Sequence, residues 1–145
     1  MSNDHASRPL AWGFVLLVSG IAGFIFADLT ISGLIHGWEG RVAIGILVVA
    51  GFVVAYRGMH RSVLHGFGVG FLSGLFAVEL QAAFLPTYFA NNPEYALVER
   101  PFGMPARLAT AVFAPINATL AGLMTAGIVW MLGRLRNRRS TGTTA

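Results

Sequence analysis

The sequence predicts an all-α integral membrane protein, a bundle of four transmembrane helices with both termini in the cytoplasm. Of its 145 residues, 55% are hydrophobic and only 11% are charged, whereas a soluble domain carries about a quarter charged residues. A chain this short with so few charges cannot cover a water-soluble surface, so lipid must solvate it. Four apolar runs and the placement of the arginines supply the rest of the prediction.

Each of the four runs is long enough to cross the roughly 30 Å hydrocarbon core at about 1.5 Å per helical residue. The first run is too long for a cleaved signal peptide, and no small-residue cleavage site follows it. A polar cytoplasmic segment, residues 1–9, precedes the transmembrane domain (10–132), and a basic cytoplasmic tail without regular structure (133–145) follows it. The expected helices cover residues 10–35, 40–59, 62–85 and 106–132.

The connections between these runs are short except for the last. A turn from His36 to Arg41 joins the first two helices, and a tight basic loop from Arg57 to Arg61 joins the next two. The third run stops at Pro86 and leaves residues 86–105 as the one substantial loop. Asn92 followed by proline and glutamate is typical of a helix start. We therefore expect a short interfacial helix there, in the outer loop, ending near Glu99.

The arginines predict the orientation. Four crossings put both termini on one side, and cytoplasmic loops carry the excess of basic residues. We expect a multi-pass protein of the cell membrane, in particular a bacterial inner membrane. The chain has no lysine and is rich in Arg, Ala and Gly, which is typical of a GC-rich genome. The side bearing the termini holds Arg8, Arg57, Arg61, Arg134, Arg136, Arg138 and Arg139, and the other holds Arg41, Arg100 and Arg107.

Small residues at four-residue spacing predict how the third and fourth helices pack. Residues four apart share a helix face, and small side chains let a second backbone approach closely. The sequence alone leaves two options open: the two faces pack on each other, or one is left for a second copy or a partner subunit. The third helix carries Gly66, Gly70 and Gly74, a glycine-zipper spacing, and the fourth carries Ala114, Ala118, Gly122 and Ala126.

Two acidic residues, Asp28 and Glu79, fall inside the apolar runs, where a charge costs about 2.5–3.5 kcal/mol at the bilayer centre. Both lie in the outer half at similar depth, near Gln81 and Asn117. Three interpretations compete. The acids specify helix pairing, they form a proton or cation site with Gln81 and Asn117, or they contact a partner subunit or a lipid headgroup.

The surroundings of the two acids are alike. Residues 23–30 and 74–81 both read glycine, four apolar residues, an acid, leucine and a polar residue. The match suggests two related helical hairpins with an axis along the membrane normal. Such a repeat would place Asp28 and Glu79 facing each other.

The sequence gives little indication of a bound cofactor or of a catalytic site. The four histidines, His5, His36, His60 and His65, offer no pair at equal depth on facing helices, so we expect neither haem nor zinc. Without cysteine there is no thiolate site. The basic residues flank apolar spans, which indicates topology rather than nucleic-acid binding. We expect no enzyme.

The sequence therefore favours a structural or accessory membrane protein that acts as a homo-oligomer or as a subunit of a larger membrane assembly. The alternative is a proton- or cation-coupled small transporter or channel that uses Asp28 and Glu79. The expected partners are the lipid bilayer and either a second copy or another membrane protein.

Overall fold

The computed structural model describes residues 11–57, 61–97 and 103–141, and in these ranges it holds α-helices and no strand. Four helices, α1, α2, α3 and α6, are long and apolar enough to cross a membrane. The all-helical class and the four candidate spans are thus confirmed, and the chain has the character of a multi-pass membrane protein. The helices are α1 Trp12–Ile31, α2 Glu39–Tyr56, α3 Ser62–Ala83, α4 Leu85–Asn91, α5 Pro93–Leu97 and α6 Ala106–Thr141.

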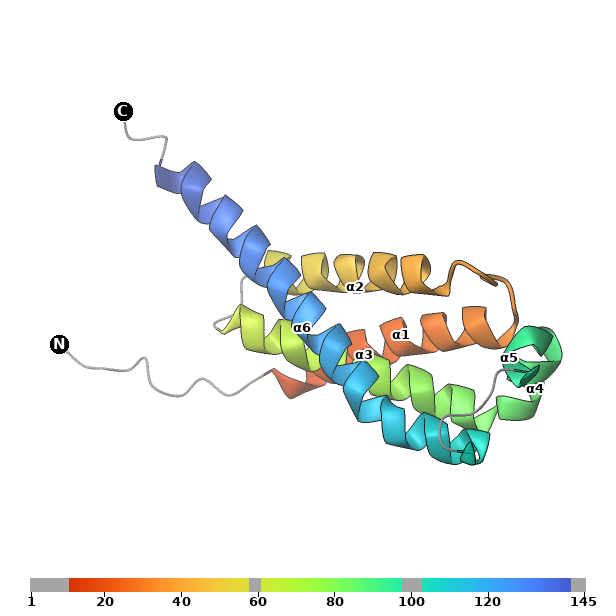
Figure 1. The fold of residues 1–145 in the computed structure, drawn as a ribbon. Coiled ribbons are helices and arrows are strands. Elements are labelled where there is room, and N and C mark those ends of the chain that lie inside the picture. The colour runs from red at the N-terminus through yellow and green to blue at the C-terminus, as the bar shows by residue number, and fades with distance from the viewer. Residues whose placement is uncertain (1–10, 58–60, 98–102, 142–145) are drawn as a thin grey trace.

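The four long helices form a bundle with α3 at its centre (Figure 1). The most extensive contact is between α3 and α6, followed by that between α1 and α3. The start of α1 and the end of α6 lie at the same end of the bundle as the end of α2 and the start of α3, and α4 and α5 lie at the opposite end. This arrangement is what four successive crossings produce.

Glycines on α3, which have no side chain, allow α6 to approach closely. A Cβ atom added at Gly70 would lie 2.5 Å from Thr125 Oγ1 and closer still to the carbonyl oxygen of Ala121. At Gly74 the added atom would lie 2.9 Å from Ala118 Cα. Both obstacles involve the α6 backbone, which cannot turn aside as a side-chain tip does. Glycine at these two positions therefore lets the helices touch backbone to backbone.

The other small residues of α3 and α6 lie in the contact between these two helices or next to it. A Cβ atom at Gly66 would lie 2.8 Å from Val129 Cγ2, and one at Gly122 would lie 2.9 Å from an aromatic ring of α3. Ala114 is buried, and Ala126 is half-buried. In the single chain the faces of α3 and α6 cover each other.

Hydrogen bonds and a second glycine join α1 to α3. A Cβ atom at Gly23 would lie 2.7 Å from the carbonyl oxygen of Ser73. The buried Ser19 hydroxyl lies 3.2 Å from the carbonyl oxygen of Val69. The buried His65 ring accepts a hydrogen bond of 3.1 Å at Nε2 from the backbone amide of the residue preceding α1. This ring therefore ties the start of α1 to the start of α3.

The first connection differs from the expected boundaries. The first helix ends at Ile31 instead of continuing to residue 35, and residues 32–38 form turns. Gly33 and Gly37 both have φ of +74°, a left-handed conformation that only glycine adopts without strain and that ends a helix. The helix α2 begins at Glu39 and ends at Tyr56 within the described residues; the expected end at residue 59 lies outside them.

The outer loop and the tail also differ from expectation. Pro86 does not end the helical structure but lies in the first turn of α4, where its missing amide hydrogen costs nothing. The short interfacial helix expected after Asn92 is α5, preceded by this second short helix; the expected end near Glu99 lies outside the described residues. The tail expected to lack regular structure is helical to Thr141, because leucine and arginine favour helix and no proline follows.

The two segments of the apparent repeat occupy different environments. Gly23 faces α3, whereas the matching Gly74 faces α6. A two-fold axis between the hairpins would direct Gly74 toward α1. These contacts do not obey that symmetry.

Candidate functional site

A cleft of about 390 Å³ lies in the half of the bundle nearest α4 and α5. One wall comes from α2 and the other from α6, while α1 and α3 form the floor. Two tyrosines from α4 and α5 lie at its outer end. The lining side chains are those of Ala22, Gly23, Phe26, Thr30, Glu39, Ala43, Ile46, Leu47, Ser73, Gly74, Ala77, Val78, Gln81, Tyr88, Tyr95, Asn117 and Ala121.

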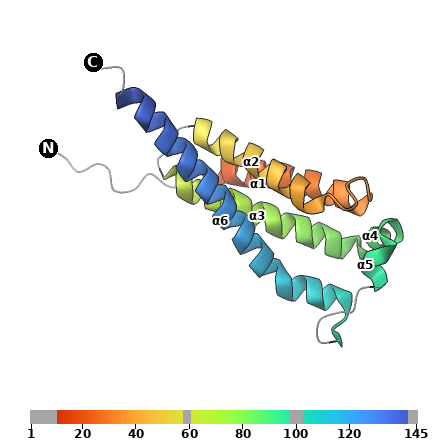
Figure 2. The ribbon, with the colours of Figure 1, turned by 45° about the horizontal axis from the view of Figure 1, so that its top comes forward.

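The cleft exists because α2 and α6 meet at one end and diverge toward the other. Near the start of α1 they touch, where a Cβ atom at Gly51 would lie 2.8 Å from Ile128 Cγ2. Toward α4 and α5 the two helices separate (Figure 1). Figure 2 shows the axis of α6 bending in its first third, where Pro115 removes a backbone hydrogen bond. Within the described part of the chain, no element closes the side between α2 and α6.

Two amide side chains supply the polar groups of the cleft wall. Gln81 Nε2 donates a hydrogen bond of 2.8 Å to Thr30 Oγ1, which in turn lies 2.9 Å from the carbonyl oxygen of Phe26. Asn117 makes no side-chain hydrogen bond to any residue the structure describes. Both amides also line a second cavity of about 310 Å³. Gln81 and Asn117 therefore belong to the lining of both cavities, as do Val78 and Tyr88.

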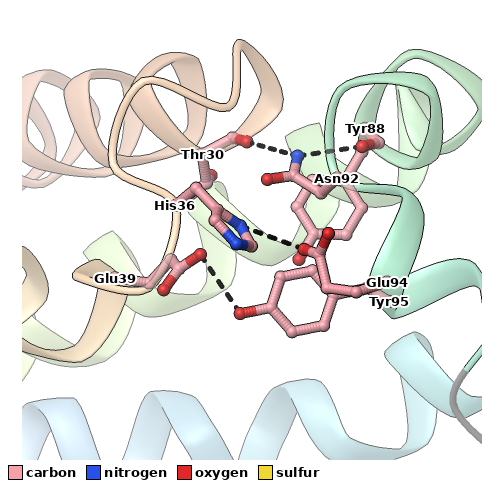
Figure 3. Close-up of polar contacts among 7 residues, drawn as sticks. All are labelled: Thr30, His36, Glu39, Tyr88, Asn92, Glu94 and Tyr95. Carbon is pink, nitrogen blue, oxygen red and sulfur yellow. Dashed lines mark hydrogen bonds and ion pairs between the residues drawn. The ribbon is translucent and has the colours of Figure 1, made fainter.

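Asparagine side chains attach the short helices to the end of α1. The buried Asn92 donates through Nδ2 to the carbonyl oxygens of Thr30 and Tyr88, at 3.0 and 2.9 Å. Asn91 donates to the carbonyl oxygen of Ile31 at 2.8 Å. The last carbonyls of a helix have no partner within it. The Gly33 amide donates to the carbonyl oxygen of Thr30 at 3.1 Å, and the two asparagine amides add further donors at this end of α1. Figure 3 shows Asn92 between Thr30 and Tyr88.

Acidic and aromatic side chains surround the mouth of the cleft (Figure 3). The Tyr95 hydroxyl donates a hydrogen bond of 3.1 Å to Glu39 Oε1, and His36 Nδ1 lies 3.0 Å from Glu94 Oε1. The rings of Tyr88 and Tyr95 are stacked, with centroids 5.8 Å apart. Glu39 is the one charged residue among the described side chains that line the cleft.

The electrostatic environment keeps both phenols protonated. Burial, together with the neighbouring Tyr95 and the charges of Glu39 and Glu94, raises the pKa of Tyr88 to about 12. Burial also raises the pKa of Tyr95, as do its hydrogen bond to the Glu39 carboxylate and the charges of Glu39 and Glu94. Both hydroxyls are therefore neutral hydrogen-bond donors at physiological pH.

The four residues proposed for an ion or proton site divide into two pairs. Gln81 and Asn117 line the cleft and the second cavity. Asp28 and Glu79 are exposed and line neither cavity. The structure therefore brings the two amides together without either carboxylate.

The described histidines lie far apart in the fold. His36 lies 3.0 Å from Glu94 of α5, and His65 is buried near the start of α3, at the opposite end of the bundle. His5 and His60 lie outside the described residues. Among the residues searched, no group of three or more His, Cys, Asp or Glu is placed to hold a metal ion.

Sequence reasoning missed Glu39, Tyr88 and Tyr95 as lining residues. The sequence places Glu39 in the turn from His36 to Arg41 and both tyrosines in the loop of residues 86–105. The one available signal was that an acid and two tyrosines all fall next to the outer ends of spans, where aromatic side chains concentrate. Nothing in the spacing indicates that they meet.

Comparison of the chain with protein-family models, with curated proteins and with solved structures finds no match. The site must therefore be interpreted from its own chemistry. A carboxylate, two phenols and two amides over an apolar lining are suited to holding a molecule with an apolar body and a polar end.

Proposed function

We propose that this chain is a small multi-pass subunit of a larger membrane assembly, built with a second copy or with another membrane protein. The arginines support an orientation with both chain ends in the cytoplasm. Arg57, Arg61, Arg134 and Arg136 belong to the end where α1 begins, whereas Arg41 and Arg107 belong to the end with α4 and α5.

The exposure of Asp28 and Glu79 on the outer surface of the single chain carries this proposal. Asp28 shares one face of α1 with Leu17, Ile21 and Phe24, since they lie eleven, seven and four residues before it. These three apolar side chains are 62%, 54% and 62% exposed. Such a surface contacts acyl chains when the chain is alone. A carboxylate within it is costly, and a partner chain that donates hydrogen bonds removes that cost.

The depth of the two acids indicates which part of the surface the partner must cover. Asp28 and Glu79 each lie about 10 Å beyond the midpoint of their helices, at about 1.5 Å per residue. That position is inside the hydrocarbon core but near its outer boundary, about 15 Å from the midplane. The contact therefore belongs to the outer half of the bilayer.

The absence of cysteine from the chain makes disulfide cross-linking a direct test. Phe24→Cys places a thiol one turn from Asp28 on the exposed face. The matched control Ala27→Cys places it on a side chain that is 1% exposed. In oxidised native membranes we expect a cross-linked species from the first variant alone, and less of it when Asp28→Asn is added. A strictly monomeric particle with no cross-link from Phe24→Cys would contradict the proposal.

Coupled transport is the second candidate. The observation that favours it is that Gln81 and Asn117 line a cleft in the outer half of the bundle. In liposomes this hypothesis expects Asp28→Asn or Glu79→Gln to abolish proton or cation flux while the protein still inserts and assembles. Unchanged flux in both variants would end it.

A further inference from the structure

We propose that the cleft between α2 and α6 binds an amphiphilic organic cation. Its apolar body lies along the two helices, and its ammonium group lies against Glu39 and the rings of Tyr88 and Tyr95. This site goes beyond assembly through Asp28 and Glu79, because neither acid lines the cleft.

The size and lining of the cleft fit an apolar body. A volume of about 390 Å³ lies within the range of roughly 300–1,000 Å³ that small-molecule pockets occupy. The floor carries small side chains at Gly23, Gly74 and Ala77, and Phe26 and Ile46 add apolar surface to the lining. Because the side between α2 and α6 is open, a molecule dissolved in the bilayer can enter sideways.

The charge at the mouth selects a cation. Glu39 is the one charged side chain among the described lining residues. The stacked rings of Tyr88 and Tyr95 lie beside it, with 13° between their planes. Aromatic faces attract an ammonium group within about 6 Å, and a carboxylate adds direct attraction. These are the two interactions by which proteins hold an alkylammonium.

Neighbouring cationic side chains do not counter this selection. The Arg41 guanidinium lies 4.5 Å from the centroid of the Trp38 ring, and neither residue lines the cleft. His36 faces Glu94 at 3.0 Å; its charge also acts on Glu39, but its ring does not line the cleft. An anionic headgroup would meet Glu39 with no basic partner in the lining, so an anion is disfavoured.

The amide side chains of Gln81 and Asn117 add polar contacts within the cleft. Asn117 has no side-chain hydrogen bond to the described residues, and Gln81 uses its nitrogen on Thr30. Placing a side-chain amide in hydrocarbon costs free energy unless a neighbouring group forms a hydrogen bond with it. A guest with a hydroxyl, an amine hydrogen or a carbonyl along its body would satisfy both side chains.

Binding of decyltrimethylammonium to the full chain in uncharged dodecyl maltoside micelles tests the site. We expect saturable binding, and competition by decyl sulfate that is at least about tenfold weaker, because the charge at the mouth is negative. Decyl sulfate that competes equally well would overturn the proposal.

Two matched pairs of variants locate the binding. Glu39→Gln removes the carboxylate in the cleft and is expected to weaken binding about tenfold. Glu94→Gln removes an exposed carboxylate that is outside the lining but whose charge still reaches the two tyrosines, so it should weaken binding less than Glu39→Gln does. Ala43→Phe fills the cleft and should abolish binding, whereas its neighbour Ile44→Phe, outside the lining, should not.

Equal effects of the two glutamate variants, or binding retained in Ala43→Phe, would overturn the proposal. Helicity and size-exclusion behaviour establish that each variant is folded.

Competition experiments in mixed micelles that contain phospholipid identify the source of the cation. Competition by phosphatidylcholine but not by phosphatidylglycerol supports a lipid ammonium headgroup as the occupant. Competition by neither lipid, with the free amphiphile still bound, supports a free cationic amphiphile.

Discussion

Replacing Gly70 with alanine should destabilise the bundle by about 2 kcal/mol, within the range of roughly 1–3 kcal/mol for overpacking a close contact. The added Cβ atom would lie 2.5 Å from Thr125 Oγ1, and real Cβ contacts are essentially never closer than 3.0 Å. The helices α3 and α6 must then separate by at least about half an ångström at this point. A gap of roughly 0.5–1 Å forfeits a quarter to a half of each dispersion contact.

The matched control is Gly20→Ala on α1, where an added Cβ meets nothing within 4 Å. That change replaces a glycine inside a helix without a clash, so it should be neutral or stabilising by up to about 1 kcal/mol. Unfolding by sodium dodecyl sulfate from mixed micelles, followed by circular dichroism, measures both variants against the parent chain. Equal stability of Gly70→Ala and Gly20→Ala would refute the backbone-to-backbone contact between α3 and α6.

Four further perturbations test separate parts of the fold. Gly33→Ala should lower the melting temperature more than Gly37→Ala; both have positive φ, but only at Gly33 would the new atom meet a backbone oxygen, at 2.8 Å. Asn92→Ala leaves two carbonyls without its amide and should cost about 2 kcal/mol in chemical unfolding; a cost below about 0.5 kcal/mol would exclude the capping role. His65→Phe should destabilise more than His65→Gln, which keeps an acceptor for the amide before α1; the reverse order in thermal melts would contradict that role. Absorbance titration of tyrosinate should lose a component near pH 12 in Tyr88→Phe. Since the folded chain holds this proton more tightly than the unfolded chain, its stabilising contribution is present below about pH 10 and is lost as the pH rises through about 12.

The spans could be predicted because hydropathy is a local property. A run of apolar residues must be solvated by lipid whatever its neighbours do. The contact of α3 with α6 is also visible in the local sequence, because two helix backbones can approach closely only where small residues recur at four-residue spacing. Gly70 and Gly74 meet α6 for that reason.

The directions of the side chains could not be predicted in the same way. A helix that is apolar on every face gives no indication of which face turns inward. Sequence position therefore placed Asp28 and Glu79 at one depth without revealing that both are exposed and outside the cleft. The apparent repeat around them is equally local, and Gly23 and Gly74 pack against different helices.

The cleft lay beyond sequence reasoning because it depends on an angle between helices. Its walls come from α2 and α6, which diverge, and its mouth from tyrosines on two short helices. One of these, α4, was missed because Pro86 was interpreted as a stop when it is a start. Glu39 reaches Tyr95 across 56 positions of sequence, a separation that no local pattern encodes.

The length of α6 has a mechanical consequence. Its 36 residues make a rod of about 54 Å, against a hydrocarbon thickness of roughly 30 Å. A helix this much longer than the hydrocarbon core must tilt or project from it. The exposed Arg134 and Arg136 near its far end are therefore placed to meet the phosphates of lipid headgroups.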